Sequence, residues 1–234
     1  CCWYWHYRSN HQVCGGLIGW GAFAPLLFLW SLIMPSTVDI ANFALNMLGA
    51  SNISALDENS KVARIINQRY ESARDFVFRE HPWNSLIRRA TLAQETTTPD
   101  FGYAFQYPLP VDPFCLRVLE FSNGALSYPQ DNMTSNSGAP VFVIEGRKLI
   151  TDEGTAKIKY IARVTDPNEY DSGLIEALAA YLASEISYAV TGSTTLVQLM
   201  YAKYEQVLKQ ARHTDATEGA PQRFEASDFI ESRL

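Results

Sequence analysis

The spacing of apolar residues changes twice along this chain, and this change constrains the fold more than any other feature of the sequence. Over residues 37–80, and again over residues 172–214, apolar side chains recur every three or four positions, as in amphipathic helices. Over residues 86–164 the repeat shortens towards two, as in strands that have one packed face. This order predicts an α+β fold, in which a helical bundle built from both ends of the chain carries an inserted β domain.

Two helices are predicted before the strand region. The first covers residues 37–48, follows a Pro-Ser-Thr capping sequence and ends at Gly49. The second covers residues 58–80 and ends before Pro82, because the residue ahead of a proline avoids helical backbone angles. Its candidate caps are Asp57 and Asn59. Its apolar stripe is expected to comprise Val62, Ile65, Ile66, Arg69, Tyr70, Ala73, Phe76 and Val77.

Two further helices are predicted after the strand region, over residues 172–190 and 195–214. The candidate caps are Asp171 or Ser172 for the first and Thr194 or Thr195 for the second. The last stripe is expected to comprise Leu196, Leu199, Met200, Lys203, Tyr204, Val207, Leu208 and Ala211. Residues 216–234 are predicted to form a polar tail with too little apolar surface to fold alone, so we expect this tail to dock elsewhere.

The strand region, residues 86–164, is predicted to form a small and mostly antiparallel β domain. Its expected strands are Phe101–Tyr107, Leu116–Phe121, Val141–Ile144, Lys148–Thr151 and Lys157–Val164. Glu145, Gly146 and Arg147 read as a hairpin turn. The last strand alternates cations with apolar residues, which predicts one wet and one packed face. The polar stretch Ser122–Gly138 is predicted to be a long exposed loop, and loops of that length are usually functional or mobile.

Residues 1–33 differ in composition from the rest of the chain. They hold a single charged side chain, Arg8, yet they carry four of the five tryptophans and three of the four cysteines. Gly15–Ile33 has no charge and approaches the length of a membrane span, although Pro25 interrupts it. One interpretation is a signal anchor. We favour the other, in which Met34 is the true start and residues 1–33 are an upstream extension.

The net charge of −6 argues against a free-standing DNA-binding protein, which would normally carry a basic excess. Cys115 is the only cysteine after residue 33, so this part of the chain cannot form an internal disulfide. A single unpaired cysteine fits a reducing cytosol. Because no catalytic partner for it is evident, we interpret Cys115 as a buried small hydrophobe.

Catalytic motifs are missing from the sequence: it contains no phosphate-binding loop, zinc spacing or nucleophile elbow. We therefore expect no enzymatic activity, no catalytic residue, no metal and no cofactor. His81 is interpreted as a cap or packing residue, and Pro82 and Trp83 as a structural anchor where the bundle meets the strands. The acidic pairs Asp57-Glu58 and Asp152-Glu153 are interpreted as a helix start and a turn. The basic groups Arg88-Arg89, Arg147-Lys148 and Lys157/Lys159/Arg163 are interpreted as a solvated face or a subunit contact.

Five local patterns occur in one order and together resemble a known family. They are IANFALNMLGASNISALDENSKVARIINQRYESARDFVFREHPWNSLIRRATLA, YPLPVDPFCLRVLEF, IEGRKLIT, IKYIARVTDPNEYDSGLIEALAAYLASEISYAVTGS and YEQVLKQARHTDATEGAP. This series is similar to the tail tubular protein A family, the head-to-tail adaptors of short-tailed bacteriophages. The similarity covers roughly Val38 to Arg233, and residues 1–33 resemble nothing in the family.

The resemblance implies a structural virion protein of the tail connector, assembled in the host cytoplasm, with residues 34–215 as the adaptor domain. In that family a ring of usually twelve subunits lies between the portal protein and the tail nozzle protein. The ring continues the channel for double-stranded DNA, which passes without sequence-specific binding. The resemblance also implies that the tail, residues 216–234, docks on a neighbouring subunit. Our candidate interface residues are Phe224, Phe229 and Ile230 of the tail, with Tyr128 and Met133 of the long loop.

Two other classes stay open. A tail-associated glycan hydrolase would need two acids that converge in a cleft. A membrane-anchored interaction protein would need residues 15–33 to be expressed and inserted, whereas we expect residues 34–234 to have no membrane partner.

Overall fold

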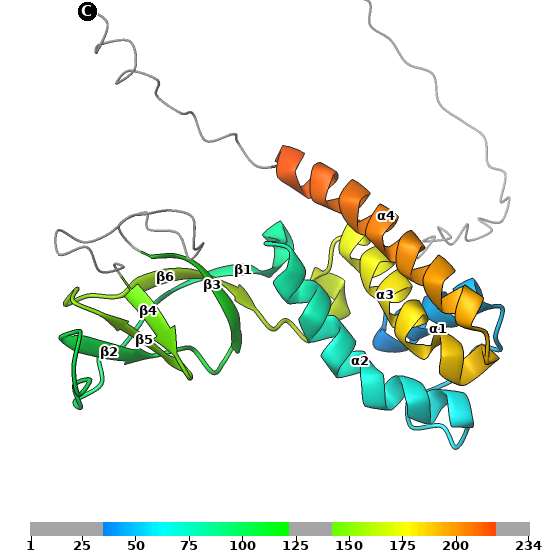
Figure 1. Ribbon diagram of the computed structural model, residues 1–234, viewed down its shortest axis with the longest axis horizontal. Helices are drawn as coiled ribbons and strands as arrows, with labels where there is room; N and C mark the ends of the chain where they lie inside the picture. Colours follow the sequence, from blue (N-terminus) through cyan, green and yellow to red (C-terminus); the bar gives the residue numbers. More distant parts are fainter. Residues whose placement is uncertain (1–34, 122–141, 219–234) are drawn as a thin grey trace, which may run out of the picture. The chain divides into compact units, whose positions relative to one another are not determined.

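The chain has an α+β fold, and its described residues form four α-helices and two small antiparallel sheets (Figure 1). It is known from a computed structural model, which describes residues 35–121 and 142–218. The segments 1–34, 122–141 and 219–234 lie outside this description, and with them lie the candidate span Gly15–Ile33 and all five candidate interface residues. These five are Tyr128, Met133, Phe224, Phe229 and Ile230.

The two N-terminal helices are α1 (Thr37–Leu48) and α2 (Lys61–Glu80). In α1 the cap is Ser36, which exchanges hydrogen bonds with Asp39 in a capping box. The predicted bounds of α1 are confirmed, but α2 begins three residues later than predicted. Its cap is Ser60, whose hydroxyl accepts the Ala63 N–H, so the assignment of this cap to Asp57 or Asn59 was wrong.

The two C-terminal helices are α3 (Ser172–Thr191) and α4 (Thr194–Glu218). Asp171 caps α3 as predicted. Gly192 ends it with a positive φ of 72°, a conformation that glycine adopts without strain. The cap predicted for α4 was wrong, because the hydroxyl of Ser193 accepts the Leu196 N–H. Only two residues therefore connect α3 to α4.

Helix α3 is the centre of the bundle, since α1, α2 and α4 all pack against it. Ten of its residues are buried, from Leu174 to Ser187, on more than one side of the helix. Within the described part of the chain, α3 alone is long and apolar enough to cross a membrane by length and composition. Its central position in the bundle accounts for that composition.

The apolar stripes of α2 and α4 are narrower than predicted. The buried residues of α2 include Ile66, Tyr70, Ala73 and Val77, whereas Phe76 is 47% exposed. The buried positions of α4 are Met200, Tyr204, Leu208, Ala211 and Asp215. The predicted members Arg69, Lys203 and Leu199 are exposed. Each helix presents one face to α3, so residues at the edge of a predicted stripe stay in solvent.

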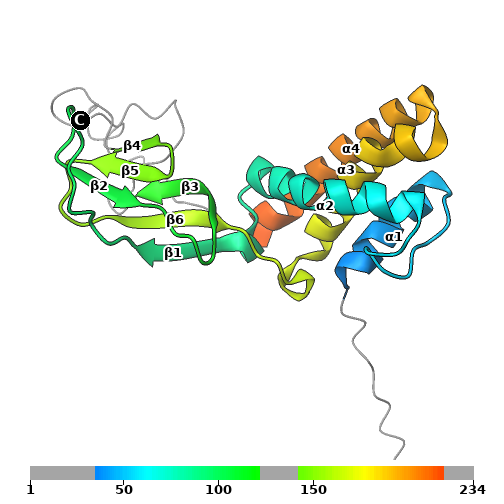
Figure 2. The ribbon, with the colours of Figure 1, turned by 90° about the horizontal axis from the view of Figure 1, so that it is seen from below.

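The strands are β1 (Ile87–Thr91), β2 (Phe105–Pro108), β3 (Cys115–Phe121), β4 (Phe142–Glu145), β5 (Lys148–Thr151) and β6 (Lys157–Ala162). They form two antiparallel sheets in the orders β1-β6-β3 and β2-β5-β4 (Figure 2). No separate strand was predicted for β1, where Arg88 and Arg89 interrupt the alternation. Strand β2 begins at Phe105 rather than Phe101, because Phe105 is the first residue paired with β5.

The two sheets share one core. Tyr107 and Leu149 from one sheet and Phe121 and Tyr160 from the other belong to the same buried cluster. The predicted hairpin is confirmed: β4 and β5 pair in register through Gly146, whose φ is 59°. The prediction that one face of β6 is exposed to solvent holds only at the start of the strand. Ile161 lies on the same face as Lys159 and is fully buried.

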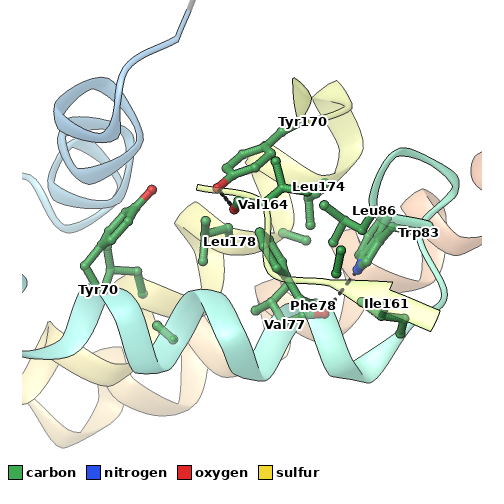
Figure 3. Packing of buried hydrophobic residues seen from close by; sticks show 14 of the residues in the cluster. Tyr70, Val77, Phe78, Trp83, Leu86, Ile161, Val164, Tyr170, Leu174 and Leu178 are labelled. Atoms are coloured by element: carbon green, nitrogen blue, oxygen red, sulfur yellow. Dashed lines mark hydrogen bonds between the residues drawn. The ribbon is translucent and has the colours of Figure 1, made fainter. Parts of the chain in front are cut away.

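The bundle and the β domain meet around the end of α2. Trp83 is fully buried there, and its indole N–H donates to the Val77 carbonyl at 3.1 Å (Figure 3). Phe78 meets Tyr170 edge to face, with ring centroids 5.4 Å apart. Asp75 adds a polar link, because its carboxylate accepts from Arg74 and pairs with Arg163 just after β6.

Candidate subunit interface

Four aromatic side chains line one face of the bundle, and we call them the aromatic band: Phe76 of α2, Tyr181 and Tyr188 of α3, and Tyr201 of α4. Phe76 stacks on Tyr181 with centroids 4.7 Å apart and planes 13° from parallel. Tyr188 is 61% and Tyr201 50% exposed. Large aromatic side chains exposed to solvent at one face of a helical bundle are typical of interaction sites.

Helix geometry brings the aromatic band together. Tyr181 and Tyr188 are seven residues apart, so they lie on the same face of α3. The buried ring of Tyr204 contacts members of the band on both α3 and α4. Its centroid is 5.0 Å from that of Tyr181 and 6.1 Å from that of Tyr201. Burial raises the pKa of the Tyr204 hydroxyl far above its usual range, so this group stays neutral. Tyr181 and Tyr201 are therefore both in contact with the core through Tyr204.

A hollow of about 330 Å³ lies beside the band, between α3 and α4. Its walls include Ser184, Glu185, Val197, Tyr201, Ala202 and Glu205. Glu185 is paired with Arg69 of α2 at 3.0 Å, which leaves Glu205 as the carboxylate at the rim without an ion pair among the described residues. A shallow apolar hollow with a charged rim suits a side chain from another protein surface.

The end of α4 is fixed by a buried carboxylate, which we call the α4 clamp. Asp215 Oδ2 lies 2.9 Å from His81 Nε2, and Asp215 Oδ1 accepts the Asn84 N–H at 3.0 Å. The Asn84 side chain donates to the Asp215 carbonyl, and Arg212 pairs with Glu80 at 2.8 Å. The clamp fixes the last turns of α4 against the end of α2, where the chain continues towards the C-terminal segment.

His81 acts as a capping and packing residue, as predicted. It is the C-cap residue of α2, and its ring meets Trp83 edge to face at 5.0 Å. Desolvation lowers the pKa of His81 more than the hydrogen bond and charge of Asp215 raise it, and Arg212 lowers it further. The neutral imidazole is therefore the favoured form at neutral pH.

The remaining sequence candidates have separate local roles. Trp83 is in the core, and Pro82 is half-buried beside it. Cys115 is a buried free thiol as predicted, and burial raises its pKa to about 11. Glu58 accepts the Ser54 N–H, and Asp152 accepts the Ala104 N–H. Both acidic pairs thus serve local loops, although the first lies before α2 rather than at its start.

Most of the basic groups have partners. Arg88 pairs with Glu169, and Lys148 pairs with Glu95 at 2.8 Å. Arg147 donates to the Cys115 and Pro110 carbonyls and lies over the Phe114 ring. Among the described residues, Arg89 and Lys157 are the exposed members of these groups that have neither an ion pair nor a side-chain hydrogen bond, whereas the exposed Arg147 has its carbonyl partners.

The aromatic band was missed in the sequence because Phe76 was assigned to the core stripe of α2. One signal was available: Phe76, Val77 and Phe78 are consecutive, and three successive residues cannot all face the core in a helix that packs through one face only. No signal could place Tyr188 or Tyr201, since either could have faced the core.

Within residues 35–121 and 142–218, no group of three or more His, Cys, Asp and Glu side chains could hold a metal ion. In comparisons with known proteins, no family model and no curated protein matches this chain.

Proposed function

We propose that this protein is a structural subunit of a bacteriophage head-to-tail adaptor, forming a ring that continues the DNA channel between the portal and the tail nozzle. The observation that carries the proposal is the aromatic band on the bundle, taken together with the ordered series of sequence patterns similar to tail tubular protein A. The proposal assigns no catalytic step to any residue.

The band has the properties of an interface between copies. It combines a stacked aromatic centre, formed by Phe76 and Tyr181, with a charged rim formed by Arg69, Glu185 and Glu205. Aromatic residues held rigidly by a core lose little conformational entropy when a partner covers them. A second copy is therefore our assigned partner for this face.

A closed ring needs two different surfaces on each subunit, because its interfaces are heterologous. Away from the aromatic band, Phe43 of α1 is 42% exposed and Leu199 of α4 is 58% exposed. These positions supply candidate apolar contacts for the second surface. The net charge of −6 also favours free passage of duplex DNA, since few cations are available for persistent phosphate contacts.

The test is imaging by negative-stain electron microscopy, with the protein alone and mixed with a portal protein. We expect rings, either alone or on the portal. The double variant Phe76→Ser, Tyr201→Ser should abolish rings while keeping the helical circular dichroism spectrum. The matched control is Phe101→Ser, which removes an 89% exposed aromatic residue of the β domain and should leave the rings intact.

A protein that stays monomeric and never binds a portal would contradict the adaptor proposal. Rings that survive the Phe76/Tyr201 double variant would keep the adaptor function but exclude the aromatic band as its interface.

A further inference from the structure

One face of the β1-β6-β3 sheet gathers cations around a hollow of about 310 Å³, and we call it the cationic face. Its lining includes Arg89 and Thr91 of β1, Lys157 and Lys159 of β6, and Glu120 of β3. Strand register explains the gathering: Arg89 lies directly opposite Lys159, and Thr91 lies opposite Lys157. Directly opposed residues of antiparallel strands share one face of the sheet.

The cationic face has an uncompensated positive charge. Glu120 approaches Lys159 at 3.8 Å, so one of the three cations has a nearby carboxylate. Arg89 and Lys157 are exposed and have no ion pair among the described residues. Like charges opposite each other destabilise a sheet, and an anionic ligand would relieve that repulsion.

The α4 clamp fixes Asp215 next to Asn84, three residues before β1 begins. Arg89 lies five residues beyond Asn84, which is at most about 18 Å along the chain. Because Asp215 Oδ1 accepts the Asn84 N–H, the Cα atoms of Asp215 and Arg89 lie within about 26 Å of each other. Glu218, the last residue of α4, is three residues beyond Asp215, which adds about 5 Å along the helix axis. Figures 1 and 2 both show this end of α4 near the start of β1.

The segment that follows α4 has matching charge and sufficient length. Residues 224–234 carry Glu225, Asp228 and Glu231 against one cation, Arg233. The net charge of this segment is −2. The cationic face has three cations and one carboxylate, so its net charge is +2 and matches the segment in magnitude. Asp228 lies ten residues beyond Glu218, and that length of extended chain reaches up to about 34 Å. The carboxylates of the segment can therefore reach Arg89 and Lys157 of the same chain.

We propose that the cationic face is the docking site for the acidic C-terminal segment 224–234 of the same chain. Asp228 and Glu231 pair with Arg89 and Lys157, and Phe229 and Ile230 between them cover the hollow. This contact holds the segment on the β domain of the free subunit, and it does not depend on ring formation.

The experiment is hydrogen–deuterium exchange of the full chain, followed by mass spectrometry of peptides that cover residues 224–234. The face variant is Arg89→Gln, Lys157→Gln, and we expect it to speed exchange in that segment about five-fold to ten-fold, the effect of losing two ion pairs. The matched control, Lys203→Gln, Lys209→Gln, removes the same charge from exposed positions of α4 and should leave exchange unchanged. Raising the salt concentration should speed exchange in the same segment.

A second variant keeps the test decisive if the face variant is destabilised. Asp228→Asn, Glu231→Gln should speed exchange in residues 87–91 and 157–159. Charge reversal on both sides, with Arg89→Glu, Lys157→Glu, Asp228→Lys and Glu231→Lys together, should restore protection. Protection that persists on dilution supports docking within one chain.

Three results would overturn the proposal. The first is a segment that exchanges as fast in the unaltered protein as in the face variant. The second is protection lost on dilution, which would assign the face to a neighbouring copy. The third is a labelled DNA duplex that binds the unaltered protein and not the face variant, while exchange in residues 224–234 stays the same; the face would then be a phosphate-binding site.

Discussion

The helical bundle and the β domain satisfy their backbone polar groups in different ways. The helices bond their own N–H and C=O groups, so side chains such as those of the aromatic band remain available for surfaces. The β domain has short strands and long connections, and its loop carbonyls depend on side-chain donors. The Arg147 guanidinium donates hydrogen bonds to the Cys115 and Pro110 carbonyls. The Gln106 side chain donates to the Thr97 carbonyl, and the Tyr107 hydroxyl donates to the Glu153 carbonyl. A substitution should therefore act through packing in the bundle and through hydrogen bonding in the β domain.

The largest effect is expected at Trp83, where the two regions meet. Trp83→Ala removes a fully buried indole and its hydrogen bond to Val77, and it should lower the free energy of unfolding by about 3 to 5 kcal/mol. Urea denaturation followed by circular dichroism measures the loss. The exposed control Phe101→Ala should change stability by less than about 0.5 kcal/mol. A loss below about 1 kcal/mol for Trp83→Ala would show that the two regions are not coupled through this residue.

The second effect tests the α4 clamp. Asp215→Ala leaves the Asn84 N–H and the His81 ring without their buried partner, and it should cost about 2 kcal/mol. The same denaturation experiment checks the loss, with Thr214→Ala on the exposed side of α4 as the control. Equal losses in the two variants would mean that the buried carboxylate contributes nothing specific.

Arg147→Gln tests whether side-chain donors stabilise the β domain. It removes two hydrogen bonds to carbonyls and the contact with Phe114, and because the site is partly exposed the expected loss is about 1 to 2 kcal/mol. Hydrogen exchange should speed up at residues 110–115 and stay unchanged in α3. Faster exchange throughout the bundle would contradict the contrast between the two regions.

A smaller effect is expected at the β4–β5 turn. Gly146→Ala forces a side chain into a left-handed conformation at φ 59°, which costs about 1 kcal/mol. Gly154→Ala is the matched control, because Gly154 is also in a loop with open space around it but lacks a positive φ. Thermal denaturation of both variants measures the difference, and indistinguishable midpoints would exclude a conformational role for Gly146.

The smallest effect concerns pH. Because the pKa of His81 is lowered in the folded state, the unfolded chain binds more protons as the pH falls below about 6.5, the usual value for histidine. The contribution of His81 to stability is thus complete above that pH and is lost as the pH falls through the folded-state pKa. His81→Gln should flatten the decline in stability on acidification, whereas His213→Gln, at an exposed position of α4, should not. A steeper loss of stability on acidification in His81→Gln than in the unaltered protein would contradict the conclusion that desolvation lowers the pKa of His81.

Local features were predictable wherever the physics acts within a few residues. The bounds of α1, the end of α2 before Pro82, the Asp171 cap and the Gly146 hairpin all follow from backbone preferences and neighbouring hydrogen bonds. The caps of α2 and α4 were assigned wrongly because several adjacent polar residues could each fill the same position. Ser60 and Ser193 are the caps, because their hydroxyl oxygens accept the Ala63 and Leu196 N–H groups.

The sequence alone determined that helices enclose a strand region, because the period of apolar residues acts through the geometry of a single element. The tertiary structure alone decided which side chains meet: Phe76 against Tyr181, Asp215 against His81, and Arg89 beside Lys159. The physical reason is that periodicity gives the direction of a side chain only relative to its own helix or strand. Contacts between elements depend on how those elements dock and pair in register, and that is decided by burial of the whole core at once.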